Sequence, residues 1–247
     1  MSGIRPEGFH PESINCQENL VITATHCFGE IEREAKNITL LNDSIPGFHP
    51  YRSSLITLEE VPLNQIHPCT LYVLEPQLGI IRQLRDAFLK QGVDPLRMTS
   101  DKALIEYRWG NHNHCIISPP VVEVSEDDGD ILVLVDGLHR VLSQELRLPT
   151  INVILVKKTA CPLPVKPVRP DEIQRCDVVP PTRKKRHFRF RESGEISRWL
   201  TEHFERFKQG FPPEQQASPP EQQALSPDYY FFRDLRILSS LGEKRKG

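Results

Sequence analysis

Apolar residues in the first two thirds of the chain alternate between short continuous runs and stripes at helical spacing. The clearest case begins at 131–135, an aliphatic run whose length and branched side chains are typical of a buried strand. Asp136 and Gly137 interrupt it, because glycine accepts turn conformations that other residues resist. Apolar positions at helical spacing follow as far as Pro149, which cannot continue a helix. The pattern predicts a strand, a tight turn and a helix.

The predicted turn bears side chains suited to binding an anion. The first N–H groups of a helix have no partner within the helix and are available to a phosphate. Arg140 adds a planar set of donors, and His139 adds a group that donates, accepts or transfers a proton near neutral pH. The alternative is that Asp136 only caps the helix, with His139 and Arg140 on a solvated first turn. The pattern alone leaves both interpretations open.

The elements around this turn resemble the ParB/sulfiredoxin-like superfamily. The core of the resemblance is an Asp-Gly-x-His-Arg motif at 136–140, followed by a helix and a strand at 151–156. Upstream, 61–68 resembles the opening strand and its V-P-L-x-x-I-x-P turn. The next elements correspond to a helix and a strand: Ile81, Leu84 and Phe88 on one helix face closed by Gly92, then 120–124. The resemblance covers about 55–158 and implies an α+β fold, a small mixed sheet with packed helices.

Members of this superfamily differ at the turn, so the residues there narrow the function. Sulfiredoxins have a catalytic cysteine before the His-Arg pair, whereas this chain has Leu138, which excludes that thiol chemistry at this position. Chromosome-partition ParB proteins usually carry Gly-Glu-Arg-Arg, which binds CTP, and continue into a helix-turn-helix domain. Free-serine kinases carry Asp-Gly-His-His-Arg, the nearest match. The resemblance implies a phosphate-binding set: Thr70, Asp136, Gly137, Leu138, His139 and Arg140.

The kinase comparison differs at the catalytic base. The kinases place a glutamate soon after the early proline, where this chain has Cys69 and Thr70. Glu75 is the nearest acidic residue downstream, while Glu59 and Glu60 lie upstream. Since a base must reach the proton that it removes, Glu75 is the weaker catalytic candidate beside His139.

Two functions follow from this resemblance. One is a phosphotransferase acting on a small hydroxylated substrate, and the other is a non-enzymatic ParB-like module that is switched by nucleotide and contacts nucleic acid. Either would bind ATP, ADP or CTP with Mg²⁺, which usually binds through phosphates and one or two carboxylates. Asp136 is the candidate metal ligand.

Composition sets outer bounds on these functions. The 247 residues carry a net charge of −2, so no overall field attracts nucleic acid or membrane. No apolar run approaches a membrane span, and no signal core opens the chain, so a cytoplasmic protein is expected. The six cysteines are irregularly spaced without a Cys-x-x-Cys pair, which favours free thiols over a disulfide framework.

An insertion between the helix ending near Gly92 and the strand at 120 invites a metal interpretation. His112, His114 and Cys115 are zinc-type ligands but supply only part of a site. The favoured alternative is a polar loop whose Tyr107 and Trp109 pack on the core.

The rest of the chain predicts appendages to a domain at 55–160. Residues 1–54 form an N-terminal extension that either adds a strand to the main sheet or covers the nucleotide site; 19–28 is its plausible strand. A Pro-rich linker at 161–182 marks a domain boundary. Segment 183–210 is a basic strand and an amphipathic helix, 211–227 is a disordered Pro/Gln tether, and 228–247 is a docking segment.

The segment 183–210 offers two surfaces. Its basic run contacts nucleic acid in one interpretation, through Arg183, Lys184, Lys185, Arg186, Arg189 and Arg191. The favoured alternative is an edge strand with Phe188 and Phe190 inward and its arginines facing water. The helix that follows buries one face on the main domain or in a homodimer: Ile196, Trp199, Leu200, Phe204 and Phe207.

Overall fold

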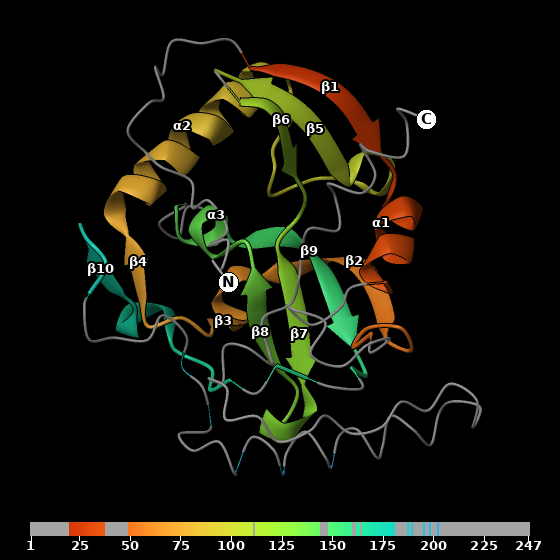
Figure 1. Cartoon of the computed structure of the whole chain (residues 1–247), viewed down its shortest axis with the longest axis vertical. Helices are drawn as coiled ribbons and strands as arrows, with labels where there is room; N and C mark the ends of the chain where they lie inside the picture. The colour runs from red at the N-terminus through yellow and green to blue at the C-terminus, as the bar shows by residue number, and fades with distance from the viewer. Residues whose placement is uncertain are drawn as a thin grey trace, which may run out of the picture.

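The chain folds into a mixed α+β domain, as predicted (Figure 1). The structure is a computed structural model that describes residues 20–37, 49–110, 112–143, 148–159, 162–163 and 165–180. It also describes the single positions 187, 189, 195, 198 and 202. Two sheets lie one above the other in Figure 1, with helices along their left and right sides.

The larger sheet has five strands in the order β2-β9-β7-β8-β3. These strands are β2 (Leu55–Pro62), β3 (Ile66–Pro68), β7 (Val121–Ser125), β8 (Ile131–Asp136) and β9 (Thr150–Lys157). β2 runs antiparallel to β9, and β7 runs antiparallel to β8. The β9–β7 and β8–β3 pairs are parallel, so the sheet is mixed. The strands predicted near 61, 120, 131 and 151 all belong to it.

The smaller sheet is antiparallel, with order β1-β5-β6. It comprises β1 (Val21–His26), β5 (Leu104–Trp109) and β6 (His112–Ile117). The predicted insertion is therefore a hairpin rather than a loop. Four apolar side chains of β5 are buried: Leu104, Ile105, Tyr107 and Trp109. Tyr107 and Trp109 do pack on the core, as expected. β1 joins this sheet, so the strand in the described part of the N-terminal extension belongs to the smaller sheet and not to the larger one.

Three α-helices lie within the described ranges: α1 (Phe28–Ala35), α2 (Glu75–Lys90) and α3 (Leu138–Leu142). The predicted apolar face of α2 is confirmed, since Leu84 and Phe88 are buried and the Phe88 ring meets Tyr107 edge-on at 4.9 Å between centroids. Gly92 follows the helix with φ +74°, the left-handed conformation common after helix ends. α2 therefore packs on the smaller sheet.

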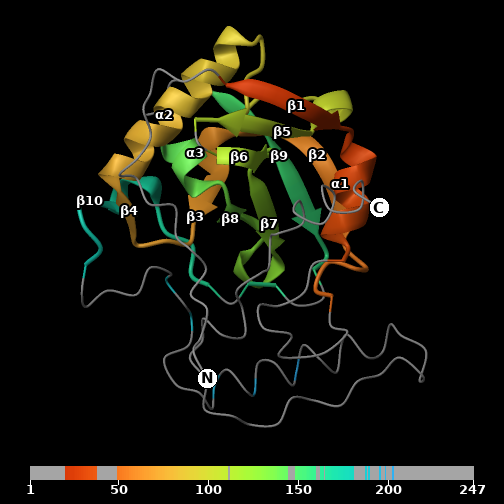
Figure 2. The same cartoon turned by 45° about the horizontal axis from the view of Figure 1, so that its top comes forward.

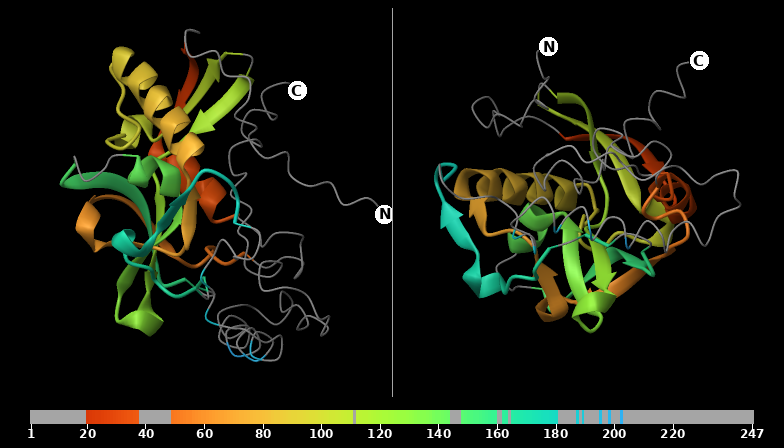
Figure 3. Two further views of the ribbon diagram at one scale, coloured as in Figure 1. Left: turned by 90° about the vertical axis from the view of Figure 1, so that its left-hand side faces the viewer. Right: turned by 60° about the horizontal axis from the view of Figure 1, so that its bottom comes forward.

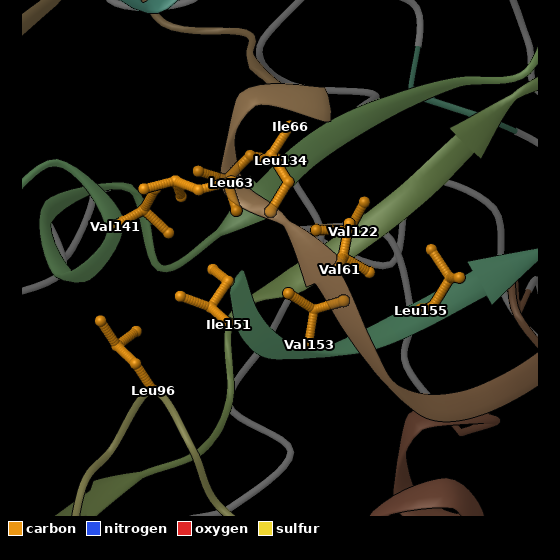
Figure 4. Packing of buried hydrophobic residues seen from close by; sticks show 10 residues of the cluster. All are labelled: Val61, Leu63, Ile66, Leu96, Val122, Leu134, Val141, Ile151, Val153 and Leu155. Atoms are coloured by element: carbon orange, nitrogen blue, oxygen red, sulfur yellow. The ribbon is translucent and has the colours of Figure 1, made fainter. Parts of the chain in front are cut away.

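A separate core fills the space between the larger sheet and α3. Figure 4 shows its buried side chains: Val61, Leu63, Ile66, Leu96, Val122, Leu134, Val141, Ile151, Val153 and Leu155. Val141 is the contribution of α3 to this core, and Leu138 packs against it. This contact fixes the short helix on the end of β8, between the larger sheet and α2 (Figure 2).

The Pro-rich segment after β9 packs on the domain. Leu163, Val165 and Val168 are buried, and β10 (Gln174–Cys176) pairs in parallel with β4 (Tyr72–Leu74). Figure 3 shows this blue-green segment against the strands. Its prolines favour the extended backbone that the sequence predicts. The segment packs its apolar side chains on the domain, however, and does not extend away from it as a free connector would. The domain division itself stays a prediction.

Several predictions fall mainly outside the described residues. Glu195, Arg198 and Glu202 have helical backbone and are exposed, which fits the polar face of the predicted helix. Its apolar face, the tether at 211–227 and the docking segment at 228–247 lie outside those ranges. Four described cysteines are free thiols: Cys27, Cys69, Cys115 and Cys176. None of the helices in the described part of the chain has the length and apolar character needed to cross a bilayer.

Candidate functional site

A cavity of about 400 Å³ opens where the two sheets, α2 and α3 meet. Its lining combines polar and apolar residues: Thr70, Ile81, Leu84, Tyr107, Ile116, Ile117, Leu134, Val135, Asp136, Gly137, Leu138, His139 and Arg140. The structure thus brings together Thr70 and the whole 136–140 motif, although 65 positions separate Thr70 from Val135. A volume of this size is typical of small-molecule sites.

Gly137 makes the turn that aims the motif at the cavity. Its φ is +90°, and it is the N-cap residue of α3. A Cβ here would lie 2.8 Å from Arg140 Nη2 and 2.9 Å from Pro120 Cβ. Glycine is therefore required at position 137 for two reasons: the backbone conformation and the close approach of Pro120.

Asp136 does not cap the helix, so that alternative is wrong. Asp136 is the last residue of β8, and α3 has no side-chain cap. Its Oδ2 instead accepts a hydrogen bond from Arg140 Nη2 at 3.0 Å across the turn. The Arg140 side chain is 16% exposed and that of Asp136 45%, so the pair lies at the cavity edge with its carboxylate toward solvent.

Arg140 has donor capacity beyond this ion pair. Within the described part of the chain, its Nε is buried without a hydrogen-bond partner. A guanidinium offers five N–H donors, so an anion in the cavity can bind Arg140 while one Nη still faces Asp136. His139, half-buried, lines the same cavity one residue earlier.

Thr70 reaches the cavity from the loop between β3 and β4. Thr70 is 7% exposed. The thiol of its neighbour Cys69 donates a hydrogen bond to the Leu134 carbonyl, with 3.4 Å between Sγ and the oxygen. This bond ties the loop to β8, directly before the motif. The Thr70 hydroxyl adds a small donor and acceptor to the cavity lining.

The hairpin β5–β6 supplies a wall that the motif does not predict. Tyr107 and Cys115 are register partners whose side chains hydrogen-bond to each other. Burial raises the pKa of Tyr107 well above its ordinary value, Cys115 raises it further, and the nearby Arg140 charge opposes the shift. Burial also raises the pKa of Cys115, although the bond with Tyr107 opposes this. Both groups are therefore neutral near pH 7, and the wall carries no charge.

No sequence signal separates this wall from ordinary core. Tyr107, Ile116 and Ile117 read as apolar residues of a buried hairpin, and only the packing of the hairpin against the other elements brings them to the cavity.

Glu75 is the one catalytic candidate outside the cavity lining. It is the first residue of α2, where its Oε1 lies 3.8 Å from Arg82 Nη1 and 3.6 Å from Arg175 Nη1. Glu59 and Glu60 lie in β2, at the opposite edge of the larger sheet from β3. The only carboxylate among the described lining residues is Asp136.

Metal binding in this cavity would therefore require a bound nucleotide. Within the described ranges, no three His, Cys, Asp or Glu side chains converge as a metal site. Asp136 alone could hold Mg²⁺ only together with the phosphates of a nucleotide. The side chains of His112 and His114 lie outside the described residues.

Of the basic residues predicted to contact nucleic acid, the structure describes Arg189, which does not lie in a strand, while the contact itself stays a prediction. Arg189 Nη2 pairs with Asp128 Oδ2, and its Nε donates to the Val165 carbonyl at 3.0 Å. The side chain is only 25% exposed because it closes over Val165. It therefore does not face water as an edge-strand arginine would. Arg183, Lys184, Lys185, Arg186 and Arg191 lie outside the described residues.

The arrangement of the lining defines which ligands fit. The lining includes a guanidinium with free donor capacity, an imidazole and a hydroxyl, which suit an anionic group. It also includes leucine, isoleucine and valine side chains from α2, α3, β6 and β8, which suit an apolar or flat group.

Comparison with known proteins gives one match. The family model of the ParB CE domain matches residues 30–170, more than half of the chain. No curated protein and no solved structure matches. The matched range includes both sheets apart from β1, all of the cavity lining and the Pro-rich segment as far as η6 (Pro170–Glu172). The chain therefore belongs to the ParB CE domain family.

Proposed function

We propose that this protein is a nucleotide-binding module, with the phosphates bound by Thr70 and residues 136–140. The observation that supports this is the pairing of Arg140 with Asp136 in the lining of a 400 Å³ cavity that also presents leucine and isoleucine side chains. An anion would meet Arg140, and a base would contact the apolar side chains. Membership in a ParB family favours a binding module.

Mg²⁺ has a specific part in this proposal. Asp136 lies next to the Arg140 guanidinium that would bind the phosphate, so its carboxylate would repel a nucleotide that carries no metal ion. A Mg²⁺ ion bound to the phosphates would reverse this, because Asp136 then becomes a ligand and releases Arg140 to the phosphate. We therefore infer that nucleotide binds as its Mg²⁺ complex.

Nucleotide binding requires no catalytic base in the cavity lining, whereas phosphoryl transfer does. Activation of a substrate hydroxyl requires a base within hydrogen-bond reach or one water away. Asp136 already accepts a hydrogen bond from Arg140, and Glu75 faces Arg82 and Arg175 instead of the cavity. A phosphotransferase would need His139 as that base.

A thermal-shift panel of ATP, ADP, CTP and GTP, each with and without Mg²⁺, tests the proposal. A ligand at 100 times its Kd stabilises by about 2.7 kcal/mol, which raises Tm by several degrees. The His139→Ala/Arg140→Ala variant should lose this shift. Product analysis of the stabilising nucleotide then separates the binding module from the phosphotransferase. No shift with any nucleotide, or an unchanged shift in the double variant, contradicts the proposal.

A further inference from the structure

The segment that follows β9 returns to the loop that carries Thr70. We call residues 162–163 and 165–180, together with 187 and 189, the strap. Three of its N–H groups donate to carbonyls on either side of Thr70. Val168 donates to Pro68 at 2.7 Å, His187 to Cys69 at 2.9 Å and Gln174 to Leu71 at 3.0 Å. Thr70 therefore lies within a stretch whose flanking carbonyls are held by the strap.

The strap is itself anchored at both ends to the larger sheet. At its start, the Leu163 N–H donates at 2.9 Å to Glu123, a β7 carboxylate that is 2% exposed and also accepts from Tyr51. At its end, Arg189 pairs with Asp128, in the turn between β7 and β8. Between these points β10 extends β4, which leads directly into α2.

The two runs of the strap also hold each other. Lys166 N–H donates to the His187 carbonyl at 2.7 Å, and Arg189 Nε donates to the Val165 carbonyl at 3.0 Å. Release of Arg189 would therefore loosen the 187 run and, through it, the bond to Cys69. Cys69 is the residue that ties the loop to β8 beside the motif.

We propose that the strap is a positioning element of the cavity, which fixes Thr70 through the 68–71 carbonyls and so couples strap docking to cavity occupancy. The nature of the occupant rests on the function proposed above, whereas the holding of the loop does not. If the docked strap favours binding, the bound ligand must favour strap docking by the same factor, since coupling between two sites is reciprocal. The residues at the strap end are positioning residues, because none of them lines the cavity.

The Arg189→Ala variant of the full chain tests the proposal by hydrogen exchange. It removes the pair with Asp128 and the bond to Val165 at the strap end. Arg169→Ala is the matched control, because it removes an exposed ion pair with Asp171 from the same strap. We expect exchange in peptides covering 66–74 and 163–176 to rise about tenfold in Arg189→Ala and to stay at the wild-type rate in Arg169→Ala. Arg189→Lys, which keeps the charge, should restore part of the protection.

The second measurement is the coupling between probe binding and hydrogen exchange in the strap, which a purely structural contact would not change. The probes are ATP and inorganic tripolyphosphate, each with Mg²⁺. Saturating probe should slow exchange at 163–176 in the wild type, and Arg189→Ala should weaken probe binding by a similar factor.

Each outcome decides a separate point. Faster exchange at 163–176 with a wild-type rate at 66–74 overturns the holding of the loop. Probe binding that leaves strap exchange unchanged overturns the coupling. If no probe binds, the proposed function and the coupling fail together, while the exchange rates at 66–74 still decide whether the strap holds the loop.

Discussion

Replacing Gly137 with alanine tests whether the turn before α3 is built as described. The backbone there has φ +90°, which costs a residue with a Cβ about 1–2 kcal/mol. The new Cβ would also lie 2.9 Å from Pro120 Cβ and 3.0 Å from Pro120 Cα, well inside van der Waals contact. Overpacking of this kind costs about 1–3 kcal/mol more. The expected loss of unfolding free energy is therefore about 2–5 kcal/mol.

Alanine variants of two other glycines separate the cost of the backbone conformation from the cost of the steric clash. Gly92 has φ +74° but nothing within 4 Å of an added Cβ, so Gly92→Ala should cost only about 1–2 kcal/mol. Gly79 lies within α2, also in open space and without a positive φ, so Gly79→Ala should stabilise by about 0.5–1 kcal/mol. Urea unfolding of the three variants measures the series, with equal m-values as the check on two-state behaviour. A Gly137→Ala cost no greater than that of Gly92→Ala would refute the close approach of Pro120.

Two further predictions concern charged pairs. Burial raises the pKa of the Asp94 carboxyl, but bonds from Arg85 and the Leu96 N–H outweigh it and hold the pKa below its ordinary 3.8. The ion pair should therefore make the wild type about 2 kcal/mol more stable than Asp94→Asn at pH 7. This difference should shrink as the pH falls below 3.8, through the lowered pKa, and a difference constant from pH 7 to pH 2 in urea unfolding would contradict it. In the cavity, Asp136→Asn should bind metal-free ATP several-fold more tightly than the wild type, because repulsion is removed and Arg140 is released. It should also lose the gain from Mg²⁺, and titration calorimetry showing an unchanged Mg²⁺ dependence would exclude Asp136 as a metal ligand.

The elements with strong local patterns were predictable from the sequence. The aliphatic run at 131–135 becomes β8, and the Ile81, Leu84 and Phe88 stripe becomes the packed face of α2. Gly137 marks the turn because no other residue fits its backbone. These features depend on neighbours in sequence, so a single chain reveals them.

The features that depend on distant contacts were not predictable. The sequence pattern by itself favours a helix cap at Asp136, whereas in the structure α3 has no side-chain cap and Asp136 pairs with Arg140. The proline spacing of the strap predicts extended backbone correctly, but the carbonyls that it meets lie about 100 positions earlier. Likewise, Tyr107 is one of several buried residues of β5, and its place on the cavity wall follows from the packing of the hairpin against the other lining elements.

The central claim is that Arg140 binds the phosphates of a nucleotide in this cavity. Calorimetric titration with the nucleotide and Mg²⁺ should show binding to the wild type that Arg140→Ala weakens about 10- to 100-fold, the value of a charge-assisted hydrogen bond of about 1.5–3 kcal/mol. Arg108→Ala is the matched control, because Arg108 is exposed on β5 outside the cavity lining and its loss changes the net charge equally. Unchanged affinity in Arg108→Ala with the loss in Arg140→Ala supports the claim. Equal affinity in all three proteins would contradict it.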